Sequence, residues 1–161
     1  MFALPFVIAA AASTPGVAQG TDIAGWTATT QGAGWGLTSE LQPGPSGKPE
    51  TTLALSYAGQ TRSEPGDFAQ LRRAVKPAQS RKLELRFAWG DTFTGPTAGY
   101  HFAQALIGDT VVWESDVAGG DLQAHDVVVD VTAECRGKRE ASLALRVLDR
   151  KTVTNFPVRV W

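Results

Sequence analysis

Acidic side chains are the first residues whose spacing could support chemistry. Glu114 and Asp116 lie two positions apart in an alternating segment, so their side chains point to the same side of a strand. Hydrolysis of a glycosidic bond needs two carboxyl groups across a cleft, and Asp91, in a loop, is a further candidate. The alternative, which we favour, is a solvated strand face that discourages pairing with another sheet edge.

Other catalytic patterns are missing from the sequence. His101 and His125 fit no metal-ligand spacing, and we expect each at the surface or at a strand edge. There is no Gly-x-Ser-x-Gly motif, and the only cysteine, Cys135, is expected to be a small, partly buried residue. We therefore expect a protein without catalytic activity, and we assign it no definite cofactor.

One loop could hold calcium. Asp116 and Asp121 flank the backbone carbonyl groups of Gly119 and Gly120. Calcium takes several oxygen ligands in flexible loops, so these two acids are weak candidates for a structural calcium site.

Aromatic and polar residues offer a different chemistry, the binding of sugars. Flat aromatic rings stack on pyranose rings, and polar side chains beside them hold the hydroxyl groups. Trp35 is flanked by glycines, Phe93 and Tyr100 bracket the long loop over residues 90–99, and Gln70 and Arg72 share one strand face if Leu71 points inward. The predicted binding residues are Trp35, Gln70, Arg72, Phe93 and Tyr100; ordinary packing with some exposed aromatic residues is the alternative. Trp26 and Trp89 are expected in the core, and Trp113 fits core and surface equally well.

The elements that must position these residues are strands. Apolar and polar residues alternate with period two, most clearly over 82–89, 125–132 and 140–149, and Pro/Gly turns separate the segments. Gly108-Asp109 predicts a tight hairpin turn. The expected strands, about ten in number, are 25–30, 35–41, 51–57, 68–75, 82–89, 100–107, 110–117, 125–132, 140–149 and 153–161. No helical segment could connect parallel strands, so the pattern predicts an antiparallel sandwich, jelly roll or barrel.

Composition and charge exclude several partners. The chain has 161 residues, 15 Lys+Arg against 16 Asp+Glu and a formal net charge of -1, without a basic run. Nucleic acid and anionic membrane surfaces are therefore not expected as partners. The first 19 residues are uncharged, largely apolar and end in small residues, which is typical of a signal peptide. We expect residues 20–161 to form one exported domain, secreted, periplasmic or at the cell surface, without an integral membrane span. A strand that ends on Trp161 indicates truncation from something longer.

The order of these segments resembles a known group of modules. The residues that carry the resemblance are Gly25-Trp26, then GDFAQLRRAVKPA, KLELRFAW, YHFAQALIGDTVVWESDVAGGD, HDVVVDVT, REASLALRVLD and TNFPVRVW. Together they resemble the jelly-roll, galactose-binding-like modules of secreted glycoside hydrolases and polysaccharide lyases, over residues 22–161. The resemblance implies an antiparallel jelly-roll β-sandwich.

The resemblance also implies a function, a partner and a metal. It implies a non-catalytic carbohydrate-binding or accessory module that binds glycan or polysaccharide by aromatic stacking and polar contacts, beside a catalytic domain of a longer protein. Many such modules hold a structural calcium, and Asp22 would match its first carboxylate. The alternatives are a structural or protein-interaction sandwich without sugar affinity and, less favoured, a small glycan hydrolase or lyase.

Overall fold

The computed structural model describes residues 18–23, 25–32, 35–43, 49–57, 62–91, 98–119, 123–152 and 158–160, with side chains for 25–32, 62–91, 98–119 and 123–152. Eleven strands and one four-residue helix fall in these ranges. They confirm the predicted all-β antiparallel class and come close to the predicted number of strands. No helix in this part of the chain is long and apolar enough to cross a membrane.

The strands follow the predicted alternation closely. Their bounds are β1 (Ala18–Ile23), β2 (Trp26–Gln31), β3 (Trp35–Pro43), β4 (Pro49–Tyr57), β5 (Phe68–Val75), β6 (Glu84–Trp89), β7 (His101–Ile107), β8 (Thr110–Asp116), β9 (His125–Asp130), β10 (Ala141–Asp149) and β11 (Val158–Val160). β1 is an addition to the predicted set, and the predicted start of the mature chain at residue 20 lies inside it. The short helix α1 (Thr132–Cys135) follows β9, where only a turn was expected.

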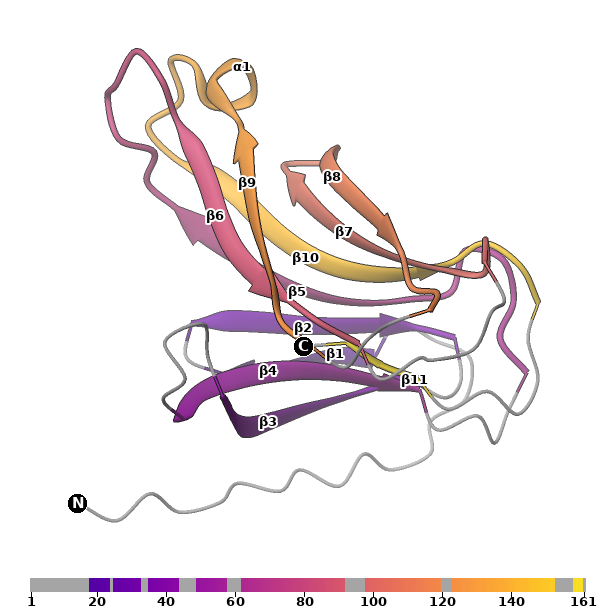
Figure 1. The fold of residues 1–161 in the computed structure, drawn as a ribbon. Helices are drawn as coiled ribbons and strands as arrows, with labels where there is room; N and C mark the ends of the chain where they lie inside the picture. Colours follow the sequence, from indigo (N-terminus) through magenta and orange to yellow (C-terminus); the bar gives the residue numbers. More distant parts are fainter. Residues whose placement is uncertain are drawn as a thin grey trace.

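The antiparallel strand pairs nest inside one another along the chain. β7 pairs with β8, β6 with β9, β5 with β10, and β4 with β11. Successive pairs alternate between pieces of sheet: β1-β2-β5-β10-β7-β8 form one six-stranded sheet, while β6-β9 and β11-β4-β3 form separate pieces. Figure 1 shows β6 and β9 crossing in front of the six-stranded sheet. A long hairpin rolled up so that its pairs alternate between two layers is a jelly roll, as predicted.

The core lies between the six-stranded sheet and the β6-β9 pair. One buried cluster consists of Ala28, Ala69, Leu71, Ala103, Val117 and Val147, with Trp26, Trp89 and Trp113 packed against it. A second cluster, around Ile107 and Val131, includes Cys135, which is 6% exposed. Trp113 is therefore a core-side residue, and Trp26 and Trp89 pack on the core as predicted.

The β7-β8 hairpin closes with a two-residue turn at Gly108 and Asp109, as predicted. Gly108 has φ of 65°, a left-handed conformation that glycine adopts without steric cost. Its backbone N–H donates to the carbonyl oxygen of Ser142 at 2.7 Å, so the turn is anchored to the neighbouring strand β10.

The end of β9 carries a carboxylate whose charge is stabilised locally. The Thr132 backbone N–H donates to Asp130 Oδ1 at 2.9 Å, and hydrogen bonds from the Thr132 side chain and backbone lower the pKa of Asp130 below its usual 3.8. Because the folded pKa is the lower one, this stabilisation is complete above the unfolded pKa and disappears as pH falls through the folded pKa.

Asp130→Asn should therefore cost stability at pH 7 and cost progressively less below pH 4. Urea denaturation of both proteins at pH 7, 4 and 3 measures this difference. Asp126→Asn, on the same exposed strand, is the control. A penalty for Asp130→Asn that is independent of pH would contradict the role given to the charge.

Candidate functional site

A continuous row of polar side chains crosses the outer face of the six-stranded sheet. The strand registers place its members opposite one another on β2, β5, β10, β7 and β8 in the order Thr29, Gln70, Arg146, Gln104 and Glu114. We call these five residues the polar row. Residues directly opposite on antiparallel strands have side chains on the same face and in contact range, so the row is one surface feature built from five strands.

The row faces away from the core because side chains alternate along each strand. Leu71 and Val147 lie in the buried cluster, so their neighbours Gln70 and Arg146 point to the opposite face. Gln70 and Gln104 are only 8% and 4% exposed. Neighbouring side chains therefore cover both amides, although they lie on the outer face.

Hydrogen bonds connect one half of the polar row. Arg146 Nε donates to Gln104 Oε1 at 2.8 Å, and Gln104 Nε2 donates to Glu114 Oε2 at 2.5 Å. Arg150 Nη2 also donates to Glu114 Oε2. No hydrogen bond joins the Gln70 side chain to another described residue, although only 8% of Gln70 is exposed.

The next row on the same face is aromatic, but cations cover its rings. It runs through Phe68, Leu148 and Phe102. The Arg146 guanidinium lies 6.0 Å from the centre of the Phe68 ring, and that of Arg150 lies 3.9 Å from the centre of the Phe102 ring. These contacts are cation–π interactions, and they leave less ring surface for a sugar.

The predicted binding residues are only partly brought together. Gln70 and Arg72 lie on β5, on the face opposite Leu71 where the sequence placed them, and their role in binding stays a prediction. Tyr100 precedes β7 and has the Lys151 ammonium 4.8 Å from its ring centre. The backbone of Trp35 begins β3, opposite Tyr57, but its side chain and the whole of Phe93 lie outside the described residues.

Of the predicted calcium ligands, only the Asp116 side chain lies within the described residues. Asp116 Oδ2 accepts a hydrogen bond from the Gly99 backbone N–H at 2.6 Å. The Asp22 side chain and Asp121 lie outside the described residues, and no cluster of three His, Cys, Asp or Glu is found among those that are described. Calcium takes six to eight oxygen ligands, and two of the three predicted ones lie outside the described residues, so the calcium site stays a prediction.

The carboxylates considered for catalysis are engaged in structural contacts. Glu114 pairs with Arg150 and Gln104, and Asp116 binds the backbone of Gly99. Asp91 is 5% exposed and takes part in a further contact.

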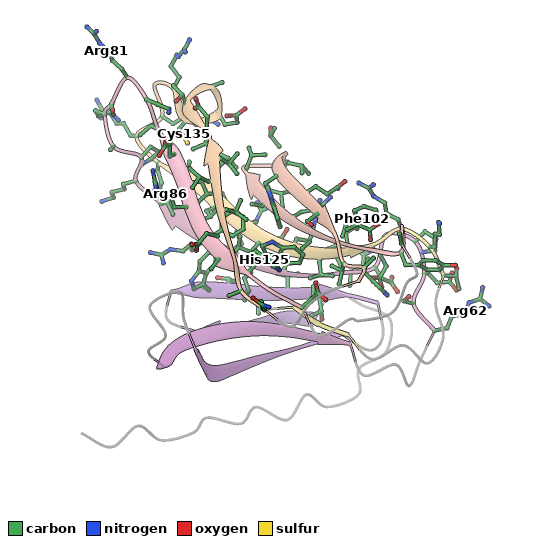
Figure 2. All side chains as sticks on the ribbon, viewed as in Figure 1. Arg62, Arg81, Arg86, Phe102, His125 and Cys135 are labelled. Atoms are coloured by element: carbon green, nitrogen blue, oxygen red, sulfur yellow. The ribbon has the colours of Figure 1, made fainter. Side chains whose placement is uncertain are left out.

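A hollow lies beside β8, the last strand of the six-stranded sheet among the described residues. This hollow, of about 430 Å³, is lined by Trp89, Asp91, Trp113, Ser115, Asp116, Ala118, Gly119, His125 and Val127. Trp89 packs against Trp113 and lies 6.1 Å from the His125 ring. In Figure 2, His125 is seen at β9 in the middle of the view, whereas Phe102 lies on the right at β7.

The two histidines differ from each other more than expected. His125 is exposed, as predicted, but His101 is 1% exposed and its Nδ1 lies 2.6 Å from Asp149 Oδ1. The surface position predicted for His101 is wrong, because the register with β10 turns it toward the core opposite Asp149.

Sequence reasoning missed three members of the polar row, Thr29, Gln104 and Arg146. Gln104 is the one polar residue within the apolar run from Phe102 to Ile107. An amide in such a strand indicates a hydrogen-bonding partner on a neighbouring strand. The alternation over residues 140–149 is compatible with an outward Arg146, but nothing in the sequence places it beside Gln104, which is 42 residues away.

Comparisons with known proteins give low similarities. No family model matches the chain, and no curated protein matches it. Among solved structures, the enzymatically active domain of tailspike protein 4 from bacteriophage CBA120 has a TM-score of 0.49 and 14% identity, over 85% of this chain and 18% of that one. The chain thus spans less than a fifth of the tailspike chain's length.

Two other similar structures match over most of their length. The family 11 carbohydrate-binding module from Clostridium thermocellum, in complex with a beta-1,3-1,4-mixed-linked tetrasaccharide, has a TM-score of 0.48 and 13% identity, over 92% of this chain and 94% of that one. The Stig cyclase Fisc from Fischerella sp. TAU has a TM-score of 0.45 and 11% identity, over 92% and 90%. At such values these likenesses assign neither a family nor a ligand.

Proposed function

We propose that this chain is a non-catalytic, galactose-binding-like module that binds glycan on the outer face of its six-stranded sheet. The polar row carries the proposal, since it sets amide, guanidinium and carboxylate groups side by side across the sheet. Sugars present many hydroxyl groups that both donate and accept hydrogen bonds, and these side chains match them in kind. The sequence resemblance supports the same role, in an exported protein and beside a catalytic domain.

Hydrogen bonding dominates the recognition in this proposal, and stacking is secondary. Arg146 and Arg150 lie over Phe68 and Phe102, so a sugar on this face meets guanidinium planes. Planar guanidinium groups can both stack and donate in a fixed fork, which fixes the orientation of a ligand.

Gln70→Ala is expected to weaken glycan binding about threefold to tenfold, the equivalent of one or two neutral hydrogen bonds. Because Gln70 is only 8% exposed, truncation also removes packed atoms, so thermal unfolding must first show that the variant is folded. Affinity electrophoresis against a panel of soluble polysaccharides, with and without EDTA, measures retention. Gln79→Ala, in the exposed segment before β6, is the matched control. Equal retention of Gln70→Ala and the unmodified chain would remove the polar row from the binding site.

The cations over the aromatic rings favour one competing function, a structural or protein-interaction sandwich without sugar affinity. Tyr100, Phe102 and Phe68 each have a cation over the ring, and such pairs also stabilise a surface that binds nothing. The discriminating result is the absence of retention by every polysaccharide of the panel, from a sample with a cooperative unfolding transition.

A further inference from the structure

Two arginines lie side by side on the outer face of the six-stranded sheet. Arg146 on β10 is opposite Gln70 on β5, and Arg72 is opposite Ala144, so Arg72 and Arg146 are diagonal neighbours on adjacent strands. Diagonal neighbours lie about 7–8 Å apart, within the reach of long side chains. Their mutual repulsion is one cause that lowers the pKa of Arg146, after burial, which is the larger cause.

Within the described part of the chain, neither guanidinium has a buried carboxylate as its partner. Arg146 forms no ion pair there; its Nε donates to the neutral Gln104 amide. Arg72 Nη2 lies 3.3 Å from Asp109 Oδ1, but the Asp109 side chain is 95% exposed in the β7-β8 turn. Arg72 Nε is buried without a hydrogen-bond partner. The nearby Glu114 carboxylate is already paired with Arg150.

Such an arrangement costs free energy in the unbound protein. Two like charges on a partly desolvated surface repel, and a buried donor without a partner loses its hydration. An anion bound near the two guanidinium groups would relieve their mutual repulsion. Guanidinium matches a planar carboxylate in particular, because its N–H groups form two parallel hydrogen bonds with the two oxygens.

We propose that Arg72 and Arg146 together recognise the carboxylate of an acidic sugar, so that the ligand is a polysaccharide containing uronic acid. This inference rests on the proposed function and names its substrate class. A general attraction of the whole chain for polyanions is not expected, because the chain has a formal net charge of -1 and a pI near 6.1.

The test compares two forms of one polymer. Retention of the chain is measured in gels that contain polygalacturonate, its methyl ester, a neutral glucan or dextran sulfate. Polygalacturonate is expected to retain the chain at least about tenfold more strongly than the methyl ester, as for the loss of a charge-assisted bidentate contact. Retention should fall as salt is raised.

Variants connect the preference to the two residues. Arg72→Gln and Arg146→Gln should each reduce retention by polygalacturonate at least about tenfold, and Arg146→Lys should restore only part of it, because lysine lacks the fork. Arg86→Gln is the matched control; it lies on β6, on the left of Figure 2, with its side chain 70% exposed. Thermal unfolding confirms that each variant is folded, and if Arg146→Gln does not fold, Arg72→Gln decides.

The outcomes separate this inference from the function on which it rests. Equal retention by polygalacturonate and its ester overturns carboxylate recognition but keeps glycan binding. Equal retention by dextran sulfate and polygalacturonate shows a response to charge alone and also overturns it. No retention by any polymer removes the proposed function together with the inference.

Discussion

Replacing Asp149 with alanine is expected to lower the free energy of unfolding by about 3 kcal/mol, the upper end of the cost of leaving a buried hydrogen-bonding group without its partner. Asp149 and His101 are 0% and 1% exposed, and Asp149 Oδ1 lies 2.6 Å from His101 Nδ1. Without the carboxylate, the Nδ1–H group of His101 loses its acceptor inside the protein. The side chains come from the adjacent interior strands β7 and β10, so the loss weakens the pairing of these two strands.

The backbone of Asp149 adds to this effect. Its N–H donates to the carbonyl oxygen of Asp67 and its carbonyl oxygen accepts from Gly66 N–H, both at 2.8 Å. The turn before β5 is therefore attached at the same residue, and a shift of the strand end would disturb it.

Urea denaturation at pH 7 measures the effect, with two reference variants. Asp149→Asn keeps an oxygen that accepts from Nδ1–H and should cost clearly less than alanine. Asp126→Ala, on the exposed strand β9, should change stability by less than about 0.5 kcal/mol. A loss below about 1 kcal/mol for Asp149→Ala would mean that the pair contributes no more than an ordinary hydrogen bond.

The same pair shows where sequence reasoning ends. Alternation located the strands, because it depends on neighbouring residues only. In β7, however, both faces carry apolar residues, so the sequence does not decide whether His101 or Phe102 points inward. The direction of His101 is set by its partner Asp149, which is 48 residues away. Local periodicity does not predict which distant strands pair, or in which register.

The polar row has the same dependence on register. The outward direction of Gln70 and Arg72 follows from Leu71 within one strand. That Arg146 lies opposite Gln70, and Gln104 opposite Arg146, follows only from the nested pairing of β5, β10 and β7. A shift of one residue in any pairing would send that strand's polar side chain to the core. The site therefore exists only through the topology, although the residue types were visible beforehand.

Trp113→Ala is expected to lower the free energy of unfolding by about 3–5 kcal/mol, as for other large aromatic residues in a core. Trp113 on β8 meets Phe87 and Trp89 of β6 edge to face, with ring centres 5.2 Å and 5.3 Å apart. These contacts join the six-stranded sheet to the β6-β9 pair, and each aromatic pair adds about 0.5–1.5 kcal/mol beyond its buried area. Trp113→Phe keeps part of the contact and should cost less. Val111→Ala, exposed on the same strand, should change stability by less than about 0.5 kcal/mol.

Trp113 also separates the two candidate binding surfaces. It lines the hollow beside His125 on the inner side of β8, whereas the polar row lies on the outer face of the sheet. If glycan binds at the polar row, folded Trp113→Phe should be retained by polysaccharide as strongly as the unmodified chain, at a temperature well below its unfolding transition. Retention lost in this variant but kept in Gln70→Ala would move the binding site to the hollow, where the indole rings of Trp89 and Trp113 would then be sugar ligands as well as part of the core.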